Sequence, residues 1–182
     1  MNTGSDFEPE KTRDGGSPGA EPDGPVRGGE GGGGLGVFLH PGRIHVSAQP
    51  CTVRTILGSC VAVCMWDPSL GIGGVNHFVL PYTVENGENS LRYGNVAVKH
   101  LIQKLLALGS SKQNLQAKLF GGACVLGAFR DRRTHLGMKN VQMAMELLRE
   151  EGIPVIAEDV GGEQGRKVIF QTHDGSAWVR RL

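Results

Sequence analysis

The sequence predicts a layered domain of the α/β (α+β) class, in which mixed or antiparallel β-sheets pack against two main helices. Most apolar residues occur in short β-type runs, and glycine- and proline-containing turns separate these runs. Two segments instead carry apolar residues at helical spacing. The chain has 182 residues, which is enough for a single domain to bury a core. Mostly strands with two inserted helices indicate stacked layers.

Local patterns place the individual elements. Strands are predicted at Val37–His40, Arg43–Ser47, Val53–Leu57, Val61–Trp66, Ala117–Phe120, Ile153–Ala157, Lys167–Phe170 and Ala177–Arg180. One helix is predicted from Asn95, as its cap, to Leu108, with Gly109 at the C′ position. A second helix is predicted over Lys139–Glu151. The polar, turn-rich segment Tyr82–Arg92 is expected to be a loop.

The first 36 residues have a different composition from the rest. Residues 1–36 are rich in Gly, Pro, Asp, Glu and Ser, and they end in GGEGGGGLG. Such a segment has little apolar surface to offset its ordering entropy, so we expect a disordered tail. The folded domain is expected to span residues 37–182.

Charge and hydropathy limit the partners. The formal net charge is +1, which gives no electrostatic argument for binding nucleic acid or an anionic membrane. No run approaches the ~18 consecutive apolar residues of a membrane span, so membrane insertion is not expected. The N-terminus lacks the basic-then-apolar pattern of a secretory signal. We therefore expect a cytoplasmic protein.

The stretch from Thr55 to Pro81 is predicted to contain a β-hairpin with chemistry at its open end. Val61–Trp66 and the apolar run that carries His77 flank a turn of Asp, Pro, Ser, Leu and Gly. If the hairpin is symmetric about the bond between Pro68 and Ser69, Cys60 lies directly opposite His77. Directly opposed residues have Cβ atoms roughly 4.5–5.5 Å apart. A thiol and an imidazole at that distance can act as nucleophile and base.

The cysteines of this stretch and a glycine pair later in the chain also have interpretations other than catalysis. A cysteine such as Cys60 is often just a small buried apolar residue. Zinc binding by Cys60 and Cys64 is disfavoured, because four residues of strand separate them by about 13 Å. The pair Gly121-Gly122 after a strand either presents N–H groups to a ligand or turns the chain. It matches neither a dinucleotide-binding fingerprint nor a P-loop.

Four blocks of sequence resemble one family. LGSCVAV, NHFVLP, KLFGGA and IPVIAEDVGG…GRKVIF occur in the same order as in the CheD family, the chemoreceptor glutamine deamidases of bacterial and archaeal chemotaxis. The resemblance runs from about Arg43 to Leu182. It implies hydrolysis of glutamine side-chain amides in the cytoplasmic helices of chemoreceptors, without a metal or cofactor. It also implies a possible partner, the CheC phosphatase.

The resemblance assigns roles to particular residues. The cysteine of GSC, here Cys60, is implied to be the nucleophile, and the histidine of NHFVLP, here His77, its base. A threonine upstream of the cysteine completes the catalytic set, which is Thr55 or, as the alternative, Thr52. Donors for the oxyanion are expected among the backbone N–H groups of Ser59, Cys60 and Val61.

Two other functions stay open at the level of sequence. The first is a chemotaxis adaptor that binds receptors without catalysis, which the presence of both Cys60 and His77 argues against. The second is a cysteine hydrolase of another kind. If His77 is not the base, His100 and His135 are the remaining candidates.

Overall fold

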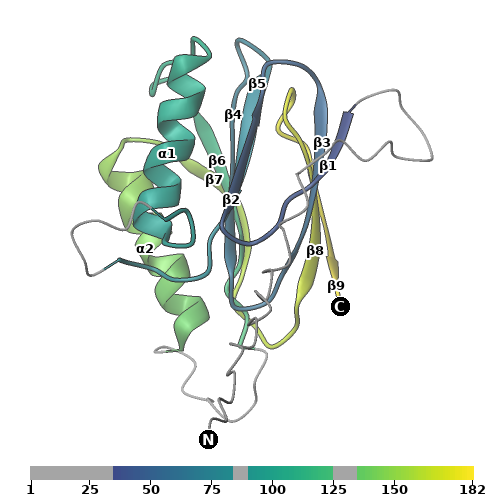
Figure 1. Ribbon diagram of the computed structural model, residues 1–182, viewed down its shortest axis with the longest axis vertical. Coiled ribbons are helices and arrows are strands. Elements are labelled where there is room, and N and C mark those ends of the chain that lie inside the picture. The colour runs from purple at the N-terminus through teal and green to yellow at the C-terminus, as the bar shows by residue number, and fades with distance from the viewer. Residues whose placement is uncertain (1–34, 84–89, 125–134) are drawn as a thin grey trace, which may run out of the picture.

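The protein is described by a computed structural model that covers residues 35–83, 90–124 and 135–182. These residues form three layers: two helices, a five-stranded sheet and a four-stranded sheet (Figure 1). The predicted fold class is therefore confirmed. The strands are β1 (Leu35–Phe38), β2 (Arg43–Ser47), β3 (Cys51–Leu57), β4 (Val61–Asp67), β5 (Ile72–His77), β6 (Gln116–Gly121), β7 (Val155–Val160), β8 (Arg166–Gln171) and β9 (Ala177–Arg181), and the helices are α1 (Gly94–Ala107) and α2 (Leu136–Glu150).

The two sheets are mixed. The larger has the strand order β2-β5-β4-β6-β7 and the smaller has the order β1-β3-β8-β9. Neighbouring strands are antiparallel, except that β1 pairs with β3, and β6 with β7, in parallel. The chain passes from the smaller sheet to the larger between β3 and β4. This crossing places the short segment around Cys60 where the end of β3 meets the start of β4, both of them interior strands of their sheets.

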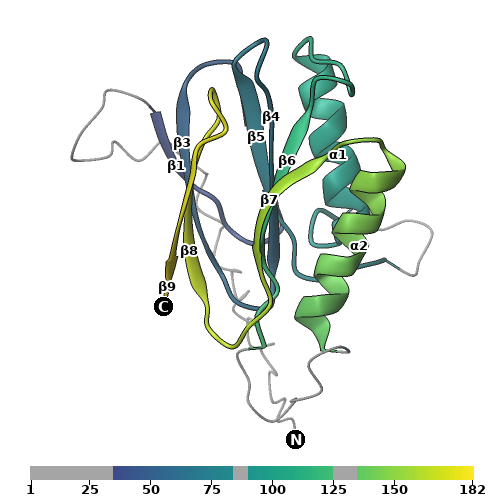
Figure 2. The same cartoon turned by 180° about the vertical axis from the view of Figure 1, so that it is seen from behind.

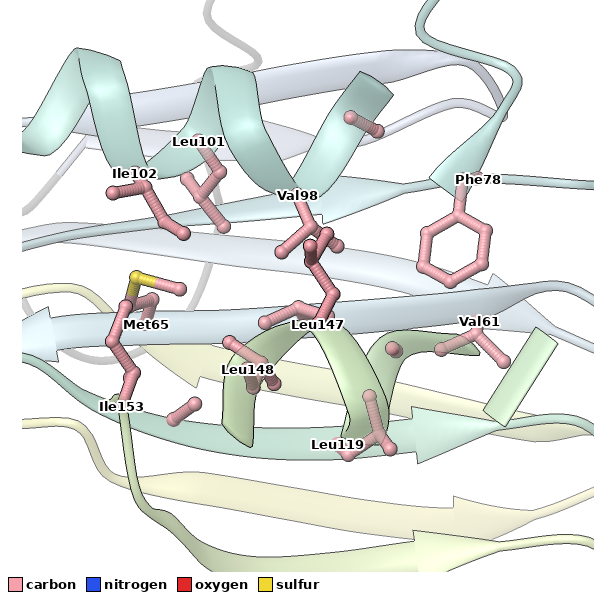
Figure 3. Packing of buried hydrophobic residues seen from close by; sticks show 14 of the residues in the cluster. Val61, Met65, Phe78, Val98, Leu101, Ile102, Leu119, Leu147, Leu148 and Ile153 are labelled. Atoms are coloured by element: carbon pink, nitrogen blue, oxygen red, sulfur yellow. The ribbon is translucent and has the colours of Figure 1, made fainter. Parts of the chain in front are cut away.

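The central strands β4 and β5 of the five-stranded sheet are buried on both faces, and two separate hydrophobic clusters result. Both helices cover the outer face of this sheet (Figure 2). Every residue of β4 is buried, and alternate residues serve the two clusters. Val61 and Met65 pack beneath the helices with Phe78 (Figure 3), and Val63 belongs to the same cluster. Ala62, Cys64 and Trp66 pack between the sheets against residues of β3 and β8.

The predicted elements are confirmed, with small shifts at their ends. The largest shifts are three residues: α2 begins at Leu136 rather than Lys139, and β7 ends at Val160 rather than Ala157. Gly109 follows α1 with φ of 100°, a conformation that suits glycine at C′. The predicted cap of α1 is wrong, because the N-cap is Tyr93. Asn95 lies inside the first turn, where its Oδ1 accepts from the backbone N–H of Thr83 at 3.3 Å.

The predicted register of the hairpin is also wrong, by two residues. Trp66 pairs with Gly73 rather than Gly71, and Asp67 is the last residue of β4 to pair. The turn is longer because the Asp67 carbonyl accepts from Gly71 N–H at 3.0 Å, and Gly71 has φ of 65°. The Asp67 carboxylate also accepts from the N–H of Ser69 at 2.9 Å. A displacement of two residues leaves every side chain on its predicted face.

Two predictions concern segments outside the described residues. The proposed tail, residues 1–36, falls there except for its last two residues, which belong to β1. The predicted loop Tyr82–Arg92 is described only at its two ends. Of the helices in the described ranges, neither is long and apolar enough to cross a membrane.

Candidate active site

Two strands and one connecting segment bring the predicted catalytic residues to one layer of the structure. Thr55 lies on β3 with its side chain toward the layer between the sheets, as the alternating burial of that strand shows. His77 ends β5, and the pairing that runs from Cys64–Val75 to Val61–Phe78 places it opposite Ala62 on the same inner side. Cys60 packs against the same inter-sheet cluster. The three residues therefore face one space.

The hydrogen bonds of Thr55 set the tautomer of His77. The Thr55 hydroxyl donates its single proton to the Leu39 carbonyl, at 2.8 Å. The same oxygen lies 2.9 Å from His77 Nδ1, so it accepts a hydrogen bond from Nδ1–H. The neutral imidazole then carries its lone pair on Nε2. That buried nitrogen has no hydrogen-bond partner, and it is available to take a proton.

Burial keeps His77 neutral at physiological pH. Desolvation lowers the pKa of His77 from 6.5 to about 4, and nearby His40 lowers it further, while the Leu39 carbonyl acts in the opposite direction because it favours the protonated ring. A neutral imidazole can accept a proton, which an imidazolium cannot. His77 is therefore in the form that a general base needs.

Cys60 is half-buried, in the three-residue connection between β3 and β4. Desolvation raises the pKa of its thiol above 9.0, while the backbone N–H of Cys60 and the guanidinium of Arg92 act in the opposite direction. Together with the lowered pKa of His77, this favours a neutral thiol beside a neutral imidazole at rest. Proton transfer to His77 would then accompany attack by the sulfur rather than precede it.

The observed register places Cys60 diagonally from His77, rather than directly opposite. His77 lies across from Ala62, and Cys60 precedes Ala62 by two residues, on the same side. Diagonal neighbours in antiparallel strands are about 7–8 Å apart, closer at their Cβ atoms. Cys60 and His77 thus lie on the same face, as predicted, but they are not directly opposite one another.

All three carbonyls of the Cys60 connection are held by hydrogen bonds. The Gly58 carbonyl accepts from Ala123 N–H at 2.8 Å, and the Cys60 carbonyl accepts from Gly122 N–H at 2.9 Å. The Ser59 carbonyl accepts from Nδ2 of Asn140 at 3.0 Å. A Cβ atom on Gly121 would lie 2.2 Å from the Cys60 carbonyl oxygen, so only glycine allows this approach. The glycine pair thus binds the Cys60 connection itself.

One of the three predicted oxyanion donors is already in use. The N–H of Val61 donates to the Phe78 carbonyl at 3.1 Å, as part of the bridge between β4 and the end of β5. Val61 is therefore a wrong candidate. Ser59 and Cys60 remain, and the N–H of Cys60 lies near its own sulfur, where it lowers the thiol pKa.

The other residues considered from sequence lie away from this arrangement. Thr52 faces the opposite side of β3, where its hydroxyl donates to Oε1 of Gln171 at 3.0 Å. Cys64 is fully buried, and burial raises the pKa of its thiol. His135 caps α2 through Nδ1, and His100 lies on α1. In the described ranges, no three or more His, Cys, Asp and Glu residues are grouped as metal ligands would be.

Sequence reasoning missed Asn140. It is fully buried on α2, where its Nδ2 donates to two backbone carbonyls of the site. The available signal was a polar residue on the apolar face of a helix: Asn140 precedes Val141 and lies four residues before Ala144. That position is normally apolar, so a carboxamide there indicates specific hydrogen-bond partners.

Comparison with known proteins supports the resemblance seen in the motifs. Residues 79–181 match the family described as CheD chemotactic sensory transduction. A protein of Anaeromyxobacter dehalogenans, named probable chemoreceptor glutamine deamidase CheD 1, is 53% identical over 152 residues, covering 84% of this chain and 88% of that protein. A protein of Trichlorobacter lovleyi, named probable chemoreceptor glutamine deamidase CheD, is 45% identical, covering 79% of this chain and 89% of that protein. A protein of Rhodospirillum rubrum with the same name is 46% identical, covering 80% of this chain and 81% of that protein.

Proposed function

This chain belongs to the CheD family, and from that premise we propose that it is a protein-glutamine deamidase that uses Cys60, His77 and Thr55 to hydrolyse side-chain amides of chemoreceptors. Its function is deamidation of chemoreceptor glutamines in chemotaxis. The observation that carries the assignment to this site is the free Nε2 of His77, in a ring whose other nitrogen is held by Thr55. The half-buried thiol of Cys60 lies on the same face of the sheet.

The first half of the reaction forms a thioester. The Cys60 sulfur attacks the carboxamide carbon of a substrate glutamine, while Nε2 of His77 takes the thiol proton. The carbonyl oxygen becomes an oxyanion, which the N–H of Cys60 can stabilise. His77 then gives its proton to the leaving nitrogen. The C–N bond breaks, ammonia departs, and the substrate stays bound to sulfur.

The second half of the reaction releases glutamate. Nε2 of His77 takes a proton from water, and the resulting hydroxide attacks the thioester carbon. The C–S bond breaks, and the thiolate of Cys60 recovers its proton from His77. The overall change is glutamine plus water to glutamate plus ammonia. The side chains named here supply every proton transfer, and Thr55 holds the ring in position throughout.

The deciding experiment uses a purified receptor cytoplasmic fragment. The wild-type protein should convert specific glutamines to glutamates, measured by peptide mass spectrometry, with one ammonia released per conversion. Hydroxylamine should divert the reaction to a hydroxamate, because it intercepts a thioester. Binding of the fragment without conversion would instead identify a non-catalytic adaptor. Conversion without hydroxamate formation would exclude the thioester route.

The cellular setting is proposed from the same family membership. The substrate helices lie on the cytoplasmic side of a chemoreceptor, so we place the protein in the cytoplasm. A CheC-type phosphatase is a proposed partner on the basis of the resemblance. Co-elution of the two purified proteins in size-exclusion chromatography would test that partnership, and separate elution at micromolar concentration would count against it.

A further inference from the structure

Asn140 connects the two chain segments that carry the proposed nucleophile and base. Its Nδ2 donates to the Ser59 carbonyl at 3.0 Å and to the Val79 carbonyl at 2.9 Å. Ser59 directly precedes Cys60, and Val79 is two residues after His77. A carboxamide nitrogen has two hydrogens, so both donors of this side chain are used.

Asn140 donates its hydrogen bonds at the point where the pairing between β4 and β5 ends. The pairing between β4 and β5 ends at the bridge of Val61 with Phe78, and in the same register the next hydrogen-bonded residues would be Ser59 and Leu80. Leu80 bonds elsewhere: its N–H donates to the Arg92 carbonyl at 3.0 Å, and its carbonyl accepts from Gly94 at 2.8 Å. Asn140 therefore supplies the donor that the strand would otherwise have provided to Ser59.

Holding the Ser59 carbonyl also fixes the direction of the next N–H group. In a planar trans peptide the N–H points away from the C=O, so the N–H of Cys60 points away from Asn140. The flanking carbonyls of Gly58 and Cys60 are held by Ala123 and Gly122, which prevents the peptide unit from turning. An oxyanion on a carbon bonded to the Cys60 sulfur would form within reach of this N–H.

We propose that Asn140 is a positioning residue for the thioester chemistry. It keeps the N–H of Cys60 directed at the developing oxyanion and keeps the Cys60 connection in place beside the strand of His77. This inference rests on the proposed function, because the oxyanion belongs to that reaction. It differs from a purely structural role, in which Asn140 would only satisfy two buried carbonyls and its loss would lower stability alone.

The test compares Asn140→Ala and Asn140→Asp with Leu148→Ala. Leu148 is fully buried on the same helix and packs in the cluster beneath the helices, so its truncation destabilises α2 without touching Cys60. All proteins are assayed with the receptor fragment well below their melting temperatures. We expect kcat of Asn140→Ala to fall about 10- to 10³-fold with little change in KM, since a misdirected oxyanion donor costs transition-state stabilisation. Asn140→Asp should behave alike, because a carboxyl group in either protonation state cannot supply both donors.

Leu148→Ala should keep kcat near the wild-type value in spite of its lower melting temperature. Equal losses of kcat in Asn140→Ala and Leu148→Ala would overturn the proposal, as would a wild-type kcat in Asn140→Ala. If Asn140→Asp fails to fold, the alanine variant decides alone.

A second measurement separates this proposal from the proposed function. Alkylation of Cys60 by iodoacetamide, followed by peptide mass spectrometry, needs no receptor. We expect alkylation to be several-fold slower in Asn140→Ala and unchanged in Leu148→Ala, because the thiol is no longer held beside His77. An unchanged alkylation rate in Asn140→Ala would overturn the positioning role. A slower rate together with no deamidation by the wild-type protein would leave Asn140 as a positioning residue of Cys60 and reject the receptor substrate.

Discussion

Two cysteine–histidine neighbourhoods lie near opposite ends of strand β3. At its beginning, the sulfur of Cys51 lies 3.4 Å from Nε2 of His45. Beyond its end, Cys60 shares the inter-sheet layer with His77 but makes no comparably direct contact with it, since Nε2 of His77 has no partner. By distance alone, the first pair would be the better candidate for a nucleophile and its base.

Accessibility and hydrogen bonding reverse that ranking. Cys51 is only 2% exposed, so no protein side chain can reach its sulfur, and burial raises the pKa of its thiol. Its backbone N–H donates to the Thr172 hydroxyl at 3.1 Å, inside the β-structure. Cys60 is half-buried, its own N–H is near the sulfur, and the ring of His77 is oriented by Thr55. Nucleophilic catalysis needs access, an oriented base and an oxyanion donor more than it needs a short resting contact.

The largest effect is expected when each thiol is removed in turn. Cys60→Ala should lower the rate of receptor deamidation by more than about 10⁴-fold, because the proposed thioester forms on the Cys60 sulfur. Cys51→Ala should retain a rate within a fewfold of the wild type, with some loss of stability from the truncated side chain. Peptide mass spectrometry of the receptor fragment measures both. A Cys51→Ala protein that folds but is inactive would make Cys51 the nucleophile.

The two histidines provide the next comparison. His77→Gln should lower the deamidation rate about 10²- to 10⁴-fold, the usual contribution of a positioned general base. Affinity for the receptor fragment should change little, because the imidazole is buried beneath the surface. His45→Gln is the matched control, and it should deamidate at nearly the wild-type rate. If affinity and turnover fell together in His77→Gln, recognition rather than catalysis would be the role of His77.

The buried imidazole of His77 also makes stability depend on pH. Its pKa is about 4 in the folded protein and 6.5 when unfolded, so the unfolded chain takes up the proton first as the pH falls from 6.5 toward 4. Stability decreases across that window. The loss of unfolding free energy between pH 7 and pH 4.5 should be about 2–3 kcal/mol smaller in His77→Gln than in the wild type. Denaturant titrations at both pH values measure the unfolding free energy. Equal losses in the two proteins would show that folding does not lower the pKa of His77.

The smallest effect concerns the two threonines of β3. Thr55→Val should lower kcat about 10- to 10²-fold, because the ring of His77 loses the acceptor that fixes its tautomer and orientation. Thr52 lies on the same strand, but its hydroxyl donates to Gln171 on the opposite face of β3. Thr52→Val should therefore leave kcat unchanged. Steady-state ammonia release measures both variants. If the two were equally active, the hydroxyl at Thr55 would serve packing alone.

Local patterns were sufficient to predict the layers, whereas the common face of Cys60 and His77 followed from an assumed hairpin register. Alternation of apolar residues identifies strands because the side-chain period of a strand is two, and helical spacing identifies α1 and α2. The same period explains why the wrong register of the hairpin still placed Cys60 and His77 on one face. An error of two residues preserves the face, whereas an error of one would have separated them.

Only the tertiary structure decided how the site is completed. The register depends on the hydrogen bonds of the Asp67 turn, which the order of the residues does not specify. Thr55 rather than Thr52 meets His77 because β3 presents alternate residues to opposite sides, and the packing of the sheets determines which side is interior. Asn140 reaches Ser59 across 81 positions of sequence. Local patterns of sequence carry no information about such a contact, because chain folding alone brings distant donors and acceptors together.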